Sequence, residues 1–120
     1  MIAEVPMQMG HGRALSRRVA VGIEPQALAI DARRGRIVVA NVAGSDRRSA
    51  SLGGGSVSIV DARTGVTLCT VPLGISPLHL ALDTRTGHAI VVGYGGYTGL
   101  NSVDVVDDVG GVILRTELLP

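Results

Sequence analysis

Short apolar runs alternate with glycine-rich polar turns along most of this chain of 120 residues. The runs are rich in valine and isoleucine and are bounded by Gly, Pro and Asp, which is typical of β-strands. No window shows the period of about 3.6 residues that an amphipathic helix requires. The pattern therefore predicts an all-β chain. The expected strands are 14–21, 26–31, 36–41, 56–61, 66–72, 78–83, 88–93, 102–107 and 112–117.

Four copies of one short signature separate pairs of these runs, and each copy is expected to turn a β-hairpin. An aspartate begins each copy and a glycine ends it. The aspartate side chain can accept a hydrogen bond from the backbone N–H two residues on, and glycine readily adopts a positive φ. The copies are Asp31–Gly35, Asp61–Gly65, Asp83–Gly87 and Asp107–Gly111.

The spacing of the four turns reveals a repeat. The first and third begin 52 residues apart (31 to 83), and the second and fourth begin 46 apart (61 to 107). Fixed periods of this size indicate solenoids, propellers or arrays. We expect antiparallel four-stranded propeller-like blades, two per chain, at 22–72 and 74–117 within the region 14–120. Strand 14–21 is an extra N-terminal strand, and 1–13, which is rich in Met and Gly without a period, is expected to be a loose arm.

Each unit carries the same ordered motifs. The first unit has Val21-Gly22, Pro25, Val38-Val39-Ala40-Asn41 and Ser56-Val57-Ser58-Ile59-Val60-Asp61. The second unit has Leu73-Gly74, Pro77, Val91-Val92-Gly93-Tyr94, in which the asparagine is absent, and Ser102-Val103-Asp104-Val105-Val106-Asp107. Through these motifs residues 15–117 resemble the YVTN repeat family of β-propellers. The resemblance implies four-stranded blades around a channel, and it does not imply a function because one fold hosts many.

Two blades are fewer than the roughly four to eight that usually close a propeller. A repeat buries its faces only against neighbours, so two blades alone would expose large apolar surfaces. We therefore expect a homo-oligomer, or else a fragment of a longer propeller protein. Three or four copies closing a six- or eight-bladed ring is the favoured arrangement, and a dimer that stacks its exposed sheets is the alternative. Strand 14–21 would then be able to pair with an edge of another copy.

Composition and charge exclude several classes of function. Eleven arginines nearly balance ten acidic residues, and the net charge of +1 predicts no nucleic-acid partner. No apolar stretch approaches the roughly 20 residues of a membrane span, and no secretory signal peptide is visible. The single cysteine, Cys69, excludes an intrachain disulfide. No Phe or Trp is present, so Val, Ile, Leu and Ala must form the core.

Candidate binding residues lie where the expected strands end at one face of the blades, because loops on a rigid scaffold commonly carry binding. Tyr94 and Tyr97, the only aromatic residues, flank two glycines and are placed to cover a ligand. The same sequence also fits a loop whose rings cover a neighbouring blade. The candidate ligand-binding residues are Glu24, Asn41, His79, Tyr94, Tyr97 and Asn101.

No catalytic, metal or cofactor site is predicted. No Gly-x-Ser-x-Gly elbow surrounds a serine, and the histidines lack zinc-site spacing. Asp104 and Asp107 should point to opposite faces of one strand, so they do not form a calcium site. The favoured interpretation is a non-catalytic propeller-type module for assembly or ligand binding, with a small molecule or a protein as partner. The alternative is a metal-dependent enzyme similar to propeller lactonases or lyases. Its metal ligands would come from Glu24, His79, Asn101 and Asp104.

Overall fold

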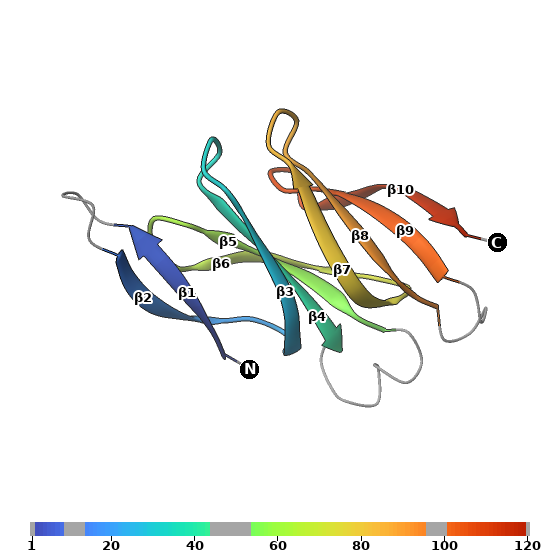
Figure 1. Cartoon of the computed structure of the whole chain (residues 1–120), viewed down its shortest axis with the longest axis horizontal. Helices are drawn as coiled ribbons and strands as arrows, with labels where there is room; N and C mark the ends of the chain where they lie inside the picture. Colours follow the sequence, from blue (N-terminus) through green and yellow to red (C-terminus); the bar gives the residue numbers. More distant parts are fainter. Residues whose placement is uncertain (1, 9–13, 44–53, 96–100, 120) are drawn as a thin grey trace.

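The computed structural model describes residues 2–8, 14–43, 54–95 and 101–119. This part of the chain contains ten β-strands and no helix, so the all-β prediction is confirmed (Figure 1). A two-stranded sheet comes first in the chain. Two four-stranded sheets follow it, and these are called the first sheet and the second sheet below. The three sheets lie in a row, with the two-stranded sheet at one end, and the molecule measures 49 × 30 × 19 Å.

The two four-stranded sheets have the same topology. Each is an antiparallel meander in which strands adjacent in sequence are adjacent in the sheet. The first sheet consists of β3 (Ile23–Asp31), β4 (Arg36–Ala43), β5 (Ser56–Asp61) and β6 (Thr67–Pro72). The second sheet consists of β7 (Ser76–Asp83), β8 (His88–Tyr94), β9 (Asn101–Asp107) and β10 (Val112–Leu118). These are the strands that the repeat predicts, and neither sheet closes on itself.

The hairpin turns are formed by the predicted chemistry. The Asp61 carboxylate accepts hydrogen bonds from the backbone N–H groups of Arg63, at 2.8 Å, and Thr64, at 3.1 Å. These N–H groups, with that of Thr64 contributing most, hold the pKa of Asp61 below its ordinary value. The glycine that ends each turn has a φ between 64° and 78°, which only glycine adopts without strain. These glycines are Gly35, Gly65, Gly87 and Gly111.

The first and second sheets stack face to face through a valine-rich core. Strand β7 packs against β3 and β4. The first sheet contributes Val38, Val57 and Ile59, which are almost fully buried, and the second sheet contributes Val91 and Val106. Alternating side chains on each strand reach this core, as the period of two predicts. Sheet stacking is therefore the interaction that holds the two units together.

The N-terminal segment differs from the expectation of a loose arm followed by one lone strand. Strand β1 (Ile2–Gln8) pairs antiparallel with β2 (Ala14–Ala20) along its whole length. The sequence pattern missed β1 because it contains Pro6 and lacks valine-rich alternation. Proline is tolerated there because both strands of a two-stranded sheet are edge strands.

The hairpin β1–β2 occupies the place in the repeat that β5–β6 occupies one unit later. Gly22 and Pro25 follow β2 as Gly74 and Pro77 follow β6. In the repeat, β5 and β6 are the third and fourth strands of their unit. The described chain therefore consists of two complete four-stranded units preceded by the outer half of a third.

Candidate functional site

The repeat gives most residues of one four-stranded sheet an equivalent in the other. Equivalent positions differ by 52 on the first two strands of a unit and by 46 on the last two. Val38 is thus equivalent to Ile90, and Val57 to Val103. In the first sheet this face is covered by the second sheet, and Val38 and Val57 are completely buried. In the second sheet no described element covers the same face, and Ile90 is 38% exposed.

The uncovered face has an apolar centre. The strand register aligns Ala81, Ile90 and Val105 in one row across β7, β8 and β9, and His79, Val92 and Val103 in the next. Residues that pair directly share one face of a sheet. We call the apolar part of this surface the open face, and it consists of Ala81, Ile90, Val92, Val103 and Val105.

Charged and polar side chains surround the open face. Arg115 pairs with Val105 in the register, Glu117 pairs with Val103, and the two charged side chains form an ion pair. Arg115 and Glu117 are equivalent to Cys69 and Val71 of the first sheet, and His79 is equivalent to Ala27. An apolar centre with a polar rim is the usual anatomy of a protein–protein interface. The open face is therefore the strongest candidate for a functional surface.

The opposite side of the molecule does not offer a comparable surface. On the first sheet, the face turned away from the core carries Ile37, Val39 and Val60, and all three are almost fully buried. Leu28 and Ile30 of β3 share this face through their register with Val39 and Ile37, and they remain 42% and 44% exposed. On this face both edge strands are uncovered, β3 at Leu28 and Ile30 and β6 at Thr70 and Pro72, whereas the second sheet exposes Ile90 at the centre of its face.

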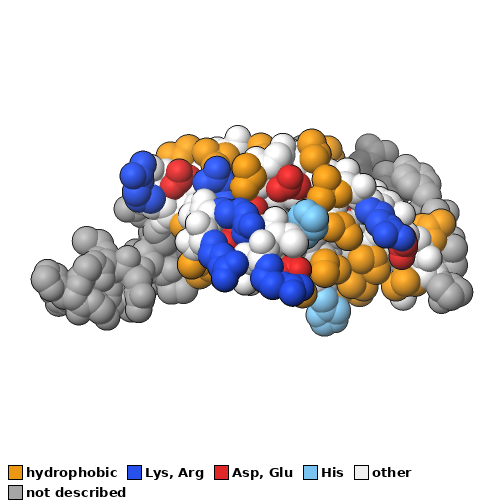
Figure 2. All heavy atoms as spheres, turned by 90° about the horizontal axis from the view of Figure 1, so that it is seen from above, with side chains coloured by type: hydrophobic (Ala, Val, Ile, Leu, Met, Phe, Trp, Pro, Cys, Tyr) orange, Lys and Arg blue, Asp and Glu red, His pale blue; other side chains and the backbone are white. Residues whose placement is uncertain are grey.

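Three hairpin turns from the two sheets meet at one end of the molecule. Arg34, in the β3–β4 turn, donates hydrogen bonds to the Asp31 carboxylate at 3.1 Å and to the carbonyl oxygens of Thr84 and Arg85 at 2.8 and 2.9 Å. Figure 2, which looks onto this end, shows basic, acidic and apolar side chains intermixed. Arg34 therefore ties the first sheet to the β7–β8 turn of the second.

A buried pair of carboxyl groups lies beside Arg34. Asp31 and Asp108 come from different sheets and are both almost fully buried, and neither carboxyl oxygen of Asp108 has a hydrogen-bond partner among the described residues. Burial and the neighbouring Asp31 raise the pKa of Asp108 to about 7. The pKa of Asp31 is lowered although its burial acts to raise it, because the neighbouring Asp108 carboxyl and Arg34, which donates hydrogen bonds from its backbone N–H and its guanidinium, favour the ionised form. The Asp108 carboxyl therefore takes up a proton as the pH falls through about 7.

Asn41, predicted to bind a ligand, is used inside the fold. Its side chain is completely buried, and Nδ2 donates hydrogen bonds to the hydroxyl oxygens of Ser56 and Ser58, both at 3.1 Å. The backbone N–H of Gly22 donates to the same Ser58 oxygen at 3.3 Å. A Cβ atom on Gly22 would lie 2.8 Å from Asn41 Nδ2, so the glycine leaves room for the amide. Asn41 thus links three segments of the first unit.

Three of the other predicted binding residues lie at the strand ends opposite the hairpin turns. Glu24 is near the start of β3, with a φ of 55°. Tyr94 ends β8 and pairs in the register with Asn101, which begins β9. His79 lies instead in the middle of β7, where it pairs with Val92. Tyr97 lies outside the described residues.

The residues of the alternative metal site do not come together in the part of the chain that the structure describes. His79 pairs with Val92 and is exposed, whereas Asp104 pairs with Val91 and is buried, so the two lie on opposite faces of the second sheet. Asp107 points away from Asp104, as the strand period predicts. Over the residues that the structure describes, no three His, Cys, Asp or Glu side chains gather in a way that could hold a metal ion.

Several residues of the candidate surfaces were not selected by sequence reasoning, notably Ile90, Arg34 and Asp108. Comparing the two units position by position supplies the missing signal. Asp108 stands where the first unit has Ala62. An acid in place of an apolar residue shows that the two units differ in chemistry at this position.

Comparisons with known proteins add no identity. No protein-family model matches the chain, and no curated protein matches it significantly. The structure also contains, within its described ranges, no helix that is long and apolar enough to cross a membrane.

Replacing Asn41 by alanine should reduce stability rather than ligand binding. The change removes the amide donor of the buried Ser56 and Ser58 hydroxyls and leaves Ser58 only the longer hydrogen bond from Gly22, which we expect to lower the free energy of unfolding by about 1–3 kcal/mol. Urea denaturation monitored by circular dichroism measures the loss. Asn101→Ala is the matched control, because this asparagine is exposed and surface substitutions usually change stability by less than about 0.5 kcal/mol. Equal losses in both variants would contradict a structural role for Asn41.

Proposed function

We propose that this chain is a non-catalytic, propeller-type assembly module that dimerises through the open face of its second sheet. The proposal is supported by one observation above all. The face that Val38, Val57 and Ile59 form in the first sheet is buried by a neighbouring sheet, and the equivalent face of the second sheet has no such cover among the described residues.

The partner that fits the open face is a second copy of the same chain. The face is a twisted sheet surface with an apolar centre, and such surfaces are covered by another sheet packing about 10 Å away. Its rim carries Arg115 and Glu117, charges of opposite sign, so two copies related by a twofold axis can place unlike charges opposite each other. Twofold dimers are also the commonest symmetric assemblies.

A dimer is favoured over the ring that the sequence analysis prefers. A ring of identical chains requires two complementary open surfaces on each chain, because each contact joins different surfaces. The outward face of the first sheet is already buried at its centre, at Ile37, Val39 and Val60, and is exposed only along its two edge strands, β3 and β6. A chain with one broad open face forms a closed pair.

Light scattering on a size-exclusion peak tests the proposal. We expect twice the 12.3 kDa mass of the chain. Ile90→Arg places a charge in the centre of the open face and should yield a monomer, because burying an unpaired charge is costly. Leu68→Arg is the control, since Leu68 is an exposed apolar residue of β6, outside the open face.

Three results would overturn the dimer. The first is a monomeric wild-type chain at high concentration, and the second is a discrete trimer or tetramer, which would favour ring closure. The third is an Ile90→Arg variant that keeps the wild-type mass while remaining folded. Circular dichroism of both variants establishes that the fold is retained.

A further inference from the structure

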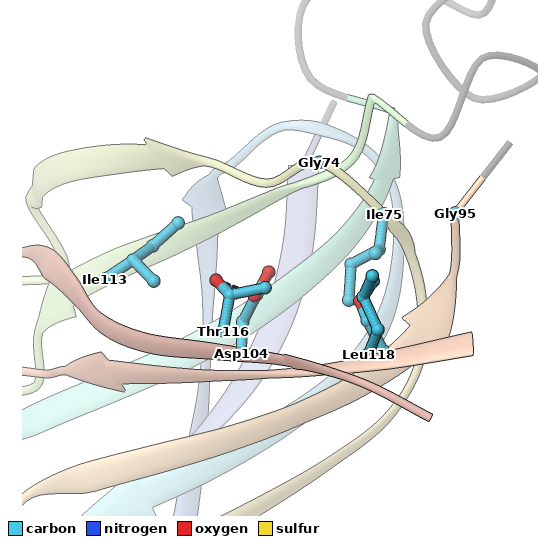
Figure 3. Close-up of a pocket in the computed structure, with 8 residues that line it drawn as sticks. Gly74, Ile75, Gly95, Asp104, Ile113, Thr116 and Leu118 are labelled. Atoms are coloured by element: carbon cyan, nitrogen blue, oxygen red, sulfur yellow. Dashed lines mark hydrogen bonds between the residues drawn. The ribbon is translucent and has the colours of Figure 1, made fainter. Parts of the chain in front are cut away.

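A pocket lies on the other face of the second sheet, the one turned toward the first sheet. It has a volume of about 150 Å³ and lies between strands β9 and β10 and the connection from β6 to β7 (Figure 3). Ile75, Ile113 and Leu118 give it apolar walls, and Gly74 forms part of its border. The pocket is separate from the open face because it lies on the opposite side of the same sheet.

Two buried polar side chains line this pocket. Asp104 is 2% exposed, and its carboxylate accepts a hydrogen bond from the Thr116 hydroxyl at 2.6 Å. Figure 3 shows these two side chains next to each other in the pocket. Ser102 is 1% exposed, and its hydroxyl has no hydrogen-bond partner among the described residues. A buried hydroxyl without a partner costs free energy, so it indicates a missing donor or acceptor.

The first unit shows what occupies the equivalent place. Gly74, Ser102 and Asp104 are equivalent to Gly22, Ser56 and Ser58, which surround the side-chain amide of Asn41. The equivalent of Asn41 in the second unit is Gly93, which has no side chain. A Cβ atom on Gly22 would lie 2.8 Å from Asn41 Nδ2, whereas a Cβ atom on Gly74 would meet nothing within 4 Å, so the place that the Asn41 amide fills in the first unit is open in the second.

Asp104 stands in the second unit where the first unit has Ser58, so the pocket favours a different kind of hydrogen-bond donor. Asn41 offers a neutral amide to two hydroxyl groups, whereas the pocket offers one hydroxyl and one carboxylate. No Lys, Arg or His is among the residues that line the pocket. A buried carboxylate is stabilised by a positively charged hydrogen-bond donor. A ligand with a charged amino group would supply both the donor and the compensating charge.

We propose that the pocket binds a small primary ammonium ion with an apolar tail. The ammonium group donates hydrogen bonds to the Asp104 carboxylate and the Ser102 hydroxyl, in the place that the Asn41 amide takes in the first unit. The tail lies against Ile75, Ile113 and Leu118. A cavity of about 150 Å³ holds a ligand of about the size of benzene, which corresponds to a short alkyl chain.

Titration with n-butylammonium, followed by methyl NMR of Ile113 and Leu118, tests this proposal. We expect saturable shifts with a dissociation constant on the order of 1 mM, a value within reach of a ligand of this size. Butyramide and n-butanol, which lack the charge, should bind at least about tenfold more weakly. Absence of saturation by n-butylammonium, or equal binding of the neutral analogues, would overturn the proposal.

Asp104→Asn removes the charge while keeping the size of the side chain. The variant should lose about tenfold or more in affinity for n-butylammonium and little for butyramide. Asp61→Asn is the matched control, because it removes one negative charge from a hairpin turn of the first sheet, outside the pocket lining and the open face. Unchanged binding by a folded Asp104→Asn variant, or an equal loss in Asp61→Asn, would refute the assignment. If Asp104→Asn does not fold, the preference of the wild-type chain for n-butylammonium over butyramide decides the question.

Discussion

Raising the pH from about 4 to about 8 is expected to reduce the stability of the chain, and Asp108→Asn is expected to remove most of that loss. The pKa of Asp108 is about 7 in the folded chain, because the carboxyl is buried beside Asp31 and Asp107, although Arg34 acts to lower it. In the unfolded chain it returns to 3.8. Between these values the folded state holds a proton that the unfolded state releases, so stability falls as the pH rises, by up to about 1.4 kcal/mol per pH unit.

The other shifted carboxyl groups act at lower pH and in the opposite direction. The pKa values of Asp31, Asp61 and Asp83 lie below 3.8, so their contribution is complete above that pH and is lost as the pH falls through their folded values. Together the four groups predict maximum stability at about pH 4. This maximum lies below the range of about pH 5 to 8 that is common for proteins.

Urea denaturation of the wild-type chain and of Asp108→Asn across this pH range measures the effect. The asparagine is neutral at every pH and can donate to the Asp31 carboxylate, so the variant should exceed the wild type in stability above pH 7. Asp107→Asn is the control. Its amide oxygen can still accept from the Val109 N–H, and Asp107 is the smallest of the named causes of the raised pKa of Asp108, so this variant should keep most of the wild-type slope with pH. Parallel profiles for the wild type and Asp108→Asn would contradict the raised pKa of Asp108.

The second large effect concerns two valines at equivalent positions of the two units. Val57→Ala should lower the free energy of unfolding by about 2 kcal/mol or more, because two methyl groups leave a closed core and a cavity remains. Val103→Ala at low protein concentration should cost less than about 1 kcal/mol, because Val103 lies on the open face and is only partly buried in one chain.

Protein concentration distinguishes the two valines further. If copies pack through the open face, Val103→Ala also weakens dimerisation, so its effect on the unfolding midpoint should grow as the concentration rises. The effect of Val57→Ala on the unfolding midpoint should not change with protein concentration. Denaturation at two widely separated concentrations checks both statements. An equal loss for the two variants at low concentration would mean that the open face is already covered within the chain.

The elements that could be predicted from the sequence are those that depend on neighbours along the chain. The turn at Asp61 and Gly65 is an example, because its hydrogen bonds join residues two to four positions apart. Valine-rich alternation identified the eight strands of the two complete units for the same reason. Strand β1 lacks that alternation, so its pairing with β2 was not visible. The strand pattern placed Glu24, Tyr94 and Asn101 at strand ends, whereas it did not reveal the internal role of Asn41.

By itself the sequence determined the repeat, the all-β class and the chemistry of each hairpin turn, because all of these depend on residue types at short separations. Only the tertiary structure decided which face of each sheet is covered and which polar groups become buried. Arg34 contacts the carbonyl of Thr84 across 50 residues, and Asp108 meets Asp31 only when the two sheets stack. The cavity beside Ser102 and the open face around Ile90 likewise arise from the stacking of whole sheets. Burial depends on what covers a residue in space, and spacing along one strand carries no record of that.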